Sequence, residues 1–299
     1  MFMAKRPLSP ERSADWASTA QFRFLDALMS DSALECSQVA FHGGTSLHFS
    51  WRSPRRSEDL DFLIAKSAGD IGQAVERAGK RTEEAFRADD PVFSVEIKDK
   101  TRRGDRMLAY QLVVSHPDYL GKTVVKVEFW RVDAAYLAGY PVELRTPVRP
   151  GEIVSRISSP VPAAALETAY CDKLTAFATR RYLKWRDIYD LWWIGTQTDA
   201  RLDLSDVTQQ FLHNVRAYET INRLAPAQAL KRFLTDHDPT VVAAMADPEL
   251  KRWLPSAVWA RLYPRATAEM VRYTWYALER VADAIEKNDL GPSLKRVSP

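Results

Sequence analysis

A chain of 299 residues in which 46% of the side chains are hydrophobic can bury one large core or two smaller ones, which excludes a wholly disordered protein. The net charge of +3 at pH 7 is too close to zero to indicate a partner by itself. No stretch resembles a secretory signal or reaches the roughly 20 apolar residues that span a membrane, so we predict a cytoplasmic protein without membrane contact.

Helical and strand patterns alternate through the first half of the chain. Apolar side chains at helical spacing predict a helix over residues 10–29, and an apolar run predicts a strand over 39–42. A short helix and a strand over 59–64 follow, and both carry motifs. The remaining predictions are a helix at about 69–86 and strands near 92–98, 107–115 and 123–130. This order predicts a mixed β-sheet with helices packed on it.

The first motif is a glycine pair followed by two hydroxyl residues, Gly43-Gly44-Thr45-Ser46, at the start of the short helix. Glycine lets the backbone approach a ligand closely, and the amide groups at a helix N-terminus bind anions. The hydroxyl of Thr45 or Ser46 can add a further donor. We therefore predict a phosphate-binding turn at these four residues.

Two carboxylates stand one residue apart in the predicted strand 59–64, whose sequence is DLDFLI. Alternate side chains of a strand share a face, so Asp59 and Asp61 point the same way. Close carboxylates repel each other, and a cation between their oxygens relieves that repulsion. Oxygen ligands suit Mg²⁺ or Mn²⁺, and Mg²⁺ completes its coordination with water and substrate phosphates. Asp59 and Asp61 are therefore predicted metal ligands.

A third acid is expected, because metal ions that bridge a triphosphate and an attacking hydroxyl need more oxygen ligands than two carboxylates supply. Glu128 is the candidate, and it lies in the strongly β-prone run 123–130. Glu96, in the run 92–98, is the rival. The strand pattern alone leaves both open.

The glycine turn and the acidic strand, in this order and spacing, resemble the signature of the polymerase-β-type nucleotidyltransferase superfamily. The resemblance favours Glu128 as the third acid, since in that superfamily the third acid sits on a neighbouring strand. It implies that Asp59, Asp61 and Glu128 hold the metal and that an NTP is the substrate. The glycine turn would then bind the phosphates of the NTP.

The second half of the chain follows a Pro- and Gly-bearing segment, 147–162, which we predict to be a linker. From there the pattern is almost wholly helical to about residue 287, with a frayed tail from 290 onward. A helix over 163–179 carries an apolar stripe at helical spacing. The stripe consists of Leu166, Tyr170, Leu174 and Phe177.

Three charged residues of this half are candidates for the site. Lys173 lies in the middle of the predicted helix, where a lysine usually faces solvent but could also stabilise charge on a triphosphate. Asp187 and Asp190 are neighbours on a second helix. For at least one of them, capping or pairing with nearby arginines is an alternative to contact with substrate. These arginines are Arg180, Arg181 and Arg186.

Two segments of this half, 172–177 (DKLTAF) and 186–191 (RDIYDL), resemble the Lys and Arg-Asp-x-Tyr-Asp-Leu motifs of the AbiEii/AbiGii toxin family, whose relatives include MenT-type toxins. The glycine turn and the Arg-x-Ser-x-Asp-Leu-Asp-Phe segment also match that family. The likeness covers about residues 39–194. It implies an α+β protein with an N-terminal nucleotidyltransferase domain, 1–150, and a C-terminal helical domain, 151–299.

The resemblance implies a metal-dependent nucleotidyltransferase toxin of a type IV-like toxin–antitoxin or phage-defence system in bacteria. The acceptor would be an RNA, the tRNA 3′ end, and the partner an antitoxin protein encoded nearby. Lys173 would lie near the triphosphate, Asp187 would be the functional aspartate of its helix, and Arg56 and Ser57 would contact the nucleotide. Ser57 could itself accept phosphate where the antitoxin is a kinase.

Basic residues gather near the predicted site in sequence, together with Trp51, Trp130 and Trp185. Such residues suit contacts with an RNA backbone and stacking on bases. Two other classes of function stay open, because fold does not fix substrate. One is a nucleotidyltransferase that modifies a small molecule or a protein side chain. The other is a catalytically inactive binding module in which the acids only hold structure.

Overall fold

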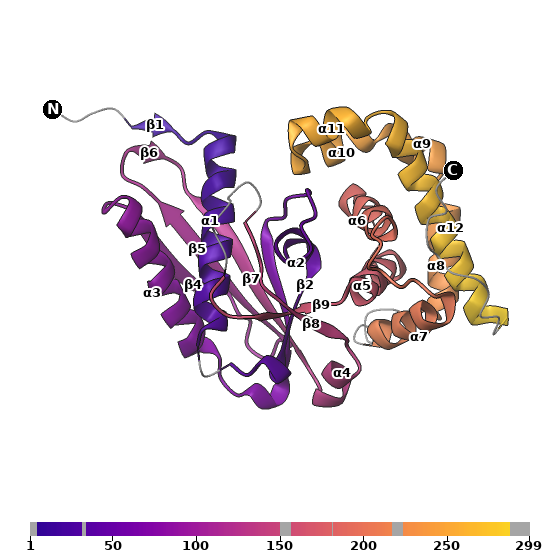
Figure 1. The fold of residues 1–299 in the computed structure, drawn as a ribbon, viewed down its shortest axis with the longest axis horizontal. Coiled ribbons are helices and arrows are strands. Elements are labelled where there is room, and N and C mark those ends of the chain that lie inside the picture. The colour runs from indigo at the N-terminus through magenta and orange to yellow at the C-terminus, as the bar shows by residue number, and fades with distance from the viewer. Residues whose placement is uncertain (1–4, 32–33, 150–156, 181, 217–223, 288–299) are drawn as a thin grey trace. The chain divides into compact units, whose positions relative to one another are not determined.

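The computed structural model describes residues 5–31, 34–149, 157–180, 182–216 and 224–287. It contains a mixed β-sheet and many helices, which confirms the predicted α+β class (Figure 1). The chain divides into two compact units. The sheet unit comprises the described residues of 1–52, 57–138 and 142–163, and the helical unit those of 53–56, 139–141 and 164–299. The predicted boundary at residue 150 falls outside the described residues and stays a prediction.

The order of strands in the sheet differs from their order in the chain. The described strands are β1 (Arg6–Pro7), β2 (Val39–His42), β3 (Asp59–Ala65), β4 (Ser94–Asp99), β5 (Met107–Ser115), β6 (Tyr119–Leu120), β7 (Thr123–Val132), β8 (Val142–Arg145) and β9 (Val161–Ala164). Seven of them form one sheet in the order β4-β5-β7-β3-β2-β9-β8, and β1 pairs with β6. β3 is parallel to β7 and antiparallel to β2. The acidic strand β3 therefore has β7 as a direct neighbour.

A row of aromatic rings fixes the register of three central strands. Phe41, Phe62 and Phe129 are paired across β2, β3 and β7. The ring centroids of Phe41 and Phe62 are 5.1 Å apart, and those of Phe62 and Phe129 are 4.8 Å apart. A shift of one residue would move these rings out of the core to the opposite face. The same register sets the position of the residue that precedes each ring, which is Asp61 on β3 and Glu128 on β7.

The helices α1 (Pro10–Met29) and α3 (Gly72–Asp89) pack against the sheet (Figure 1). Ser9 caps α1, since its hydroxyl accepts a hydrogen bond from the backbone N–H of Arg12, and Pro10 suits the first turn. Leu60 and Phe62 are fully buried in one core cluster with apolar residues of both helices. Asp59 and Asp61 alternate with these core residues and therefore lie on the other face of β3.

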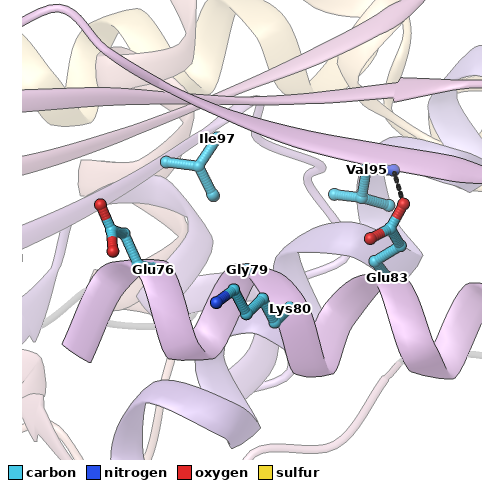
Figure 2. Close-up of a pocket in the computed structure, with 6 residues that line it drawn as sticks. All are labelled: Glu76, Gly79, Lys80, Glu83, Val95 and Ile97. Carbon is cyan, nitrogen blue, oxygen red and sulfur yellow. Dashed lines mark hydrogen bonds between the residues drawn. The ribbon is translucent and has the colours of Figure 1, made fainter. Parts of the chain in front are cut away.

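Strand β4 is an edge of the sheet and is covered by α3 (Figure 2). A Cβ atom at Gly79 of α3 would lie 2.3 Å from Cγ1 of Ile97, so glycine permits this close approach. Glu83 accepts a hydrogen bond of 3.4 Å from the backbone N–H of Val95. A pocket of about 160 Å³ lies among these side chains. Glu83 of α3 thus accepts the Val95 N–H, a backbone donor that an uncovered edge strand would leave available to another chain.

The helical unit is organised around its longest described helix, α12. The bounds are α5 (Leu166–Thr179), α6 (Trp185–Gly195), α7 (Leu204–Val215), α8 (Pro226–Asp236), α9 (Pro239–Ala244), α10 (Ala246–Leu250), α11 (Ser256–Leu262) and α12 (Arg265–Lys287). Helix α12 contacts α6, α7, α8 and α9. The predicted apolar stripe of α5 is buried, as its spacing requires. None of the helices in the described ranges is both long and apolar enough to cross a membrane.

Several predicted boundaries are wrong by a few residues. The helix predicted over 163–179 begins at Leu166, because 161–164 pairs with β2 as β9 inside the supposed linker. The helix predicted over 69–86 is α3, and it begins at Gly72, where an Asp70 carboxylate oxygen accepts the backbone N–H. The strand predicted near 92–98 is β4 at 94–99, and that near 123–130 extends to Val132. The predicted frayed tail lies outside the described residues.

Candidate functional site

Three predicted acids meet on neighbouring strands of the sheet unit, and we call them the acidic row: Asp59, Asp61 and Glu128. Asp61 on β3 is paired in register with Glu128 on β7. Asp59 lies two residues before Asp61 and is paired with Lys126. Paired residues of parallel strands point to the same face, so the three carboxylates share it. All three side chains are half-buried, and ligands could reach them.

The sheet order separates Glu128 from its rival, Glu96. Glu96 lies on β4, which β5 and β7 separate from β3. Its side chain is 57% exposed and pairs with Lys98 at 3.3 Å. The structure therefore places Glu128, and not Glu96, beside Asp61. Of the two glutamates, Glu96 is the exposed carboxylate on an edge strand.

The electrostatics of the acidic row favour a bound cation. Burial raises the pKa of Glu128, and the charges of Asp61 and Asp59 raise it further. The Lys126 ammonium opposes this shift in pKa and lies 3.9 Å from Asp59. Within the described ranges, no three His, Cys, Asp or Glu side chains already form a metal-binding cluster. The donor chemistry of the row still fits Mg²⁺ or Mn²⁺, since these ions prefer oxygen ligands. A bound cation would also relieve the repulsion between the carboxylates.

The glycine turn lies directly against the acidic row. Gly43 begins α2 (Gly43–Ser50) with φ +77°, a conformation that L side chains rarely adopt. A Cβ atom at residue 43 would lie 2.5 Å from Oδ2 of Asp61. The N-terminus of an eight-residue helix and the predicted metal ligand are thus adjacent. A phosphate bound at the amides would face a cation held by the acids.

The hydroxyl residues of the turn have different environments. Thr45 is fully buried, and its hydroxyl donates a hydrogen bond to the carbonyl of Asp59, which ties α2 to β3. Ser46 is 2% exposed, and its hydroxyl has no partner in the part of the chain that the structure describes. Gly44, which precedes Thr45 in the turn, is also buried. Of the two hydroxyls, the structure favours that of Ser46 as a donor to a ligand.

Replacing Gly43 with Ala is expected to abolish most nucleotide transfer. The new Cβ would displace the Asp61 carboxylate, and the positive φ would cost about 1 kcal/mol of stability. Gly69→Ala is the matched control, because Gly69 has φ +72° but nothing within 4 Å of its Cβ position. Both variants should lose stability in denaturant titrations, because both positions have positive φ, while only Gly43→Ala loses activity. Equal activities of the two variants would contradict this role of the turn.

Lys173 and Asp187 lie in the helical unit, within a network of charges. Asp190 accepts hydrogen bonds from Nε and Nη2 of Arg55 at 2.5 and 2.7 Å. The ammonium of Lys173 is 2.8 Å from Asp190 and 3.1 Å from Asp187. The other oxygen of Asp187 accepts a hydrogen bond from Arg180. We call these five residues the charge network.

The network changes the interpretation of Lys173 and of both aspartates. Lys173 is only 11% exposed, so it does not face solvent as a mid-helix lysine usually does. Asp187 and Asp190 are both ion-paired, and the pairing alternative holds for Asp187 with Arg180. The pairing of Asp190 with Arg55 was not predicted, since the two are 135 residues apart and no local pattern marks them. The catalytic roles of Lys173 and Asp187 stay predictions.

Acid should weaken the network through Asp187. Burial alone would raise the pKa of Asp187, but the charges of Lys173 and Arg180 outweigh it and lower the pKa to about 2. A lowered pKa in the folded state stabilises the fold above the unfolded value near 3.9, and this stabilisation is lost as the pH falls toward 2. The difference in unfolding free energy between wild type and Asp187→Asn should therefore shrink by about 2 kcal/mol between about pH 6 and pH 2. A difference that stays constant in denaturant titrations would contradict this.

The residues before the acidic strand have separate positions. Arg56 belongs to the helical unit, where its backbone N–H donates to the carbonyl of Trp253 at 2.8 Å. Ser57 belongs to the sheet unit, and its carbonyl accepts a hydrogen bond of 3.0 Å from Gln21. The Arg56 side chain is exposed and that of Ser57 is half-buried. Their contacts with a nucleotide stay predictions.

The three tryptophans predicted to stack on bases differ in their accessibility. Trp185 is 1% exposed, and its indole N–H donates to the carbonyl of Val242 at 2.9 Å. No face of that ring is open to a base, so its predicted role is wrong. Trp51 and Trp130 are half-buried, and the guanidinium of Arg145 lies 4.0 Å from the ring centroid of Trp51. Their contacts with bases stay predictions.

Comparison with known families gives a match over residues 23–260 to the family described as nucleotidyl transferase AbiEii toxin, type IV toxin–antitoxin system. The chain belongs to the AbiEii family. The match extends beyond residues 39–194, where the motifs of the sequence end. It confirms the predicted family and shows that the protein is a nucleotidyltransferase toxin. No curated protein matches the sequence.

Solved structures share the fold of this AbiEii-family chain. JHP933 from Helicobacter pylori is 17% identical, with a TM-score of 0.52 over 94% of this chain and 96% of its own. MenT4, a nucleotidyltransferase toxin from Mycobacterium tuberculosis H37Rv, is 21% identical, with a TM-score of 0.50 over 93% of this chain and 90% of its own. At these identities the likeness shows the fold alone.

Membership of the AbiEii family carries two consequences for the chain. A type IV toxin–antitoxin system implies an antitoxin partner. Nucleotidyltransferases of this kind generally use an NTP and a divalent metal, and the family does not specify the metal. The acidic row and the glycine turn are where this structure could accommodate both.

Proposed function

We propose that the protein transfers nucleotides from an NTP to an RNA acceptor, the tRNA 3′ end, in the bacterial cytoplasm. Mg²⁺ or Mn²⁺ would be held by Asp59, Asp61 and Glu128. The observation that carries the proposal is the register of β3 and β7, which sets Asp61 beside Glu128 while Gly43 lies against Asp61. A metal-bound triphosphate needs acids to hold the metal and amides to bind its phosphates, and the acidic row and the glycine turn bring both together.

The residues of the chain have distinct parts in this proposal. When bound, the divalent ion supplies positive charge to the triphosphate. The amides of the turn at Gly43 and Gly44, with the Ser46 hydroxyl, hold the phosphates. The acceptor hydroxyl then attacks the α-phosphorus in line, forming a new P–O bond as the bond to the bridging oxygen breaks and pyrophosphate leaves. The proton of the hydroxyl passes to a carboxylate of the acidic row.

Lys173 and Asp187 are proposed to act as a pair. Lys173 is held by Asp187 and Asp190, so its ammonium is positioned in advance for negative charge on a nucleotide. Asp187 would then be a positioning residue that orients both Lys173 and Arg180. Lys173→Met should accordingly raise the KM for the NTP and lower kcat. Lys173→Arg should restore neither value, because the planar guanidinium does not reproduce the compact charge of an ammonium.

The acceptor is tested by incubating the purified protein with each α-labelled NTP and total RNA. We expect label in RNA of tRNA size, at the 3′ end by sequencing, and none when the divalent ions are chelated. Label in a protein or small-molecule fraction would instead favour the alternative acceptors, and no label in any fraction would favour an inactive binding module. Co-expression with a neighbouring antitoxin gene should suppress the transfer.

A further inference from the structure

The helical unit contains a second place suited to a phosphate, formed by other residues than those of the acidic row. A pocket of about 290 Å³ lies between the end of α5 and α8. Its polar lining consists of Arg180, Arg232, Asp236 and His237, and its apolar wall includes Phe177 and Phe233. The volume approaches that of sites for small organic ligands, so the pocket can hold more than a single water or ion.

Both arginines of the pocket retain donors for a ligand. Arg180 uses one N–H on Asp187, and a guanidinium has five. Arg232 lies 3.9 Å from Asp236, which is beyond hydrogen-bonding distance, and its side chain is 52% exposed. Asp187 also holds Arg180 in place, so one of the two guanidiniums is already oriented. Planar guanidiniums bind phosphate through two parallel hydrogen bonds.

His237 is fixed in the pocket by two contacts with Phe233. Its Nδ1 donates a hydrogen bond of 2.9 Å to the carbonyl of Phe233, one of the last carbonyls of α8. Its ring is stacked on that of Phe233, with centroids 4.2 Å apart. With Nδ1 committed to the backbone, Nε2 is the nitrogen left for a ligand, and it donates when the imidazole is protonated.

The charges around Arg180 are predominantly positive. Burial lowers the pKa of Lys184, and the charges of Arg186 and Arg180 lower it further. Burial is the largest cause of that shift, and repulsion among the three cations adds to it. A phosphate near Arg180 would relieve this repulsion.

We propose that this pocket binds a phosphate group, held by Arg180 and Arg232 with Nε2 of His237, while the Phe177 and Phe233 wall contacts the attached sugar. Two sources have this chemistry: a free phosphate or mononucleotide, and a backbone phosphate of the RNA acceptor. The RNA source rests on the proposed function; the phosphate site does not. Arg180 links the pocket through Asp187 to Lys173, so an occupied pocket would bear directly on the charge network.

The test needs a readout confined to the pocket, because the glycine turn is expected to bind phosphate as well. Ring ¹⁵N signals of His237, assigned with His237→Gln, are followed in the full chain while inorganic phosphate is added at constant ionic strength. Wild type should show saturable shifts. Arg232→Ala should need about tenfold more phosphate, as expected for one charged hydrogen bond. Asp236→Asn should need less, because it removes a repelling carboxylate from the lining.

The matched control is Arg272→Ala, since Arg272 is an exposed arginine of α12 that does not line the pocket. It should behave like wild type. The site would be ruled out if His237 did not respond to phosphate, if Arg272→Ala had the effect of Arg232→Ala, or if Asp236→Asn weakened binding. An opposite pair of effects at Arg232 and Asp236 cannot arise from general loss of folding.

A second arm distinguishes the two sources of phosphate. Filter binding of a short single-stranded RNA is measured over a range of salt concentrations. An RNA source predicts weaker binding by Arg232→Ala and a salt slope smaller by about 1. Unchanged RNA binding with altered phosphate binding assigns the pocket to free phosphate or a mononucleotide. Failure of wild type to label RNA would remove the proposed function and leave the phosphate result standing.

Discussion

Asp61→Asn is expected to reduce nucleotide transfer at least about 100-fold while the protein stays folded. Asn keeps the shape of the side chain but removes the charge that would hold the divalent ion beside the glycine turn. Glu128→Gln should have a similar effect, because Glu128 is paired in register with Asp61. The measurements are initial rates of incorporation from a labelled NTP and thermal unfolding of each variant.

Glu96→Gln is the control for both substitutions, since it removes a glutamate from the same sheet at an exposed edge strand. Its transfer rate should equal that of wild type. If Glu96→Gln were inactive and Glu128→Gln active, the third acid would have been assigned to the wrong strand. Wild-type rates for Asp61→Asn would indicate that the acids only hold structure.

Asp190→Asn is expected to lower the unfolding free energy by about 3–5 kcal/mol, because removing one partner leaves buried charges uncompensated. Asp190 is fully buried and is shared by Arg55, which is 1% exposed, and by Lys173. Lys173 would retain Asp187, but the Arg55 guanidinium would lose both of its hydrogen bonds to a carboxylate. Denaturant titration of the purified variant measures the loss.

Asp283→Asn is the matched control, because Asp283 also pairs with two cations but at the surface of α12. It should leave the unfolding free energy close to that of wild type, because exposed ion pairs contribute little to stability. The double replacement Arg55→Met with Asp190→Leu should recover part of the loss, since it removes the unpaired charge as well. Additive losses in the double variant would show that Arg55 and Asp190 are not coupled.

The pattern of residues predicted the side-chain directions of the acidic strand but not which glutamate lies beside it. A period of two places Asp59 and Asp61 on one face wherever the strand lies. Glu96 and Glu128 both occur in β-prone runs, and only the strand order, with β7 and not β4 beside β3, separates them. Strand order depends on which faces the helices cover, and local sequence does not encode that.

The charge network was beyond prediction for a related reason. Helical spacing placed Lys173 beside the apolar stripe of α5, and sequence motifs linked it to Asp187. The burial of Lys173 and the pairing of Asp190 with Arg55 require segments 135 residues apart to pack together. Long-range pairings of this kind leave no periodic signal in either segment.

The sequence by itself determined the family, the place of the glycine turn at the start of a short helix and the shared face of Asp59 and Asp61, because these depend on residue type and short spacing. The tertiary structure alone decided that Glu128 lies beside Asp61, that Gly43 contacts it and that Lys173 is buried between two aspartates. The physical reason is that register and burial are set by packing of distant apolar residues, such as the Phe41, Phe62 and Phe129 row. Short sequence motifs therefore predict which residue types are present, and the packing of the core determines how they are arranged in space.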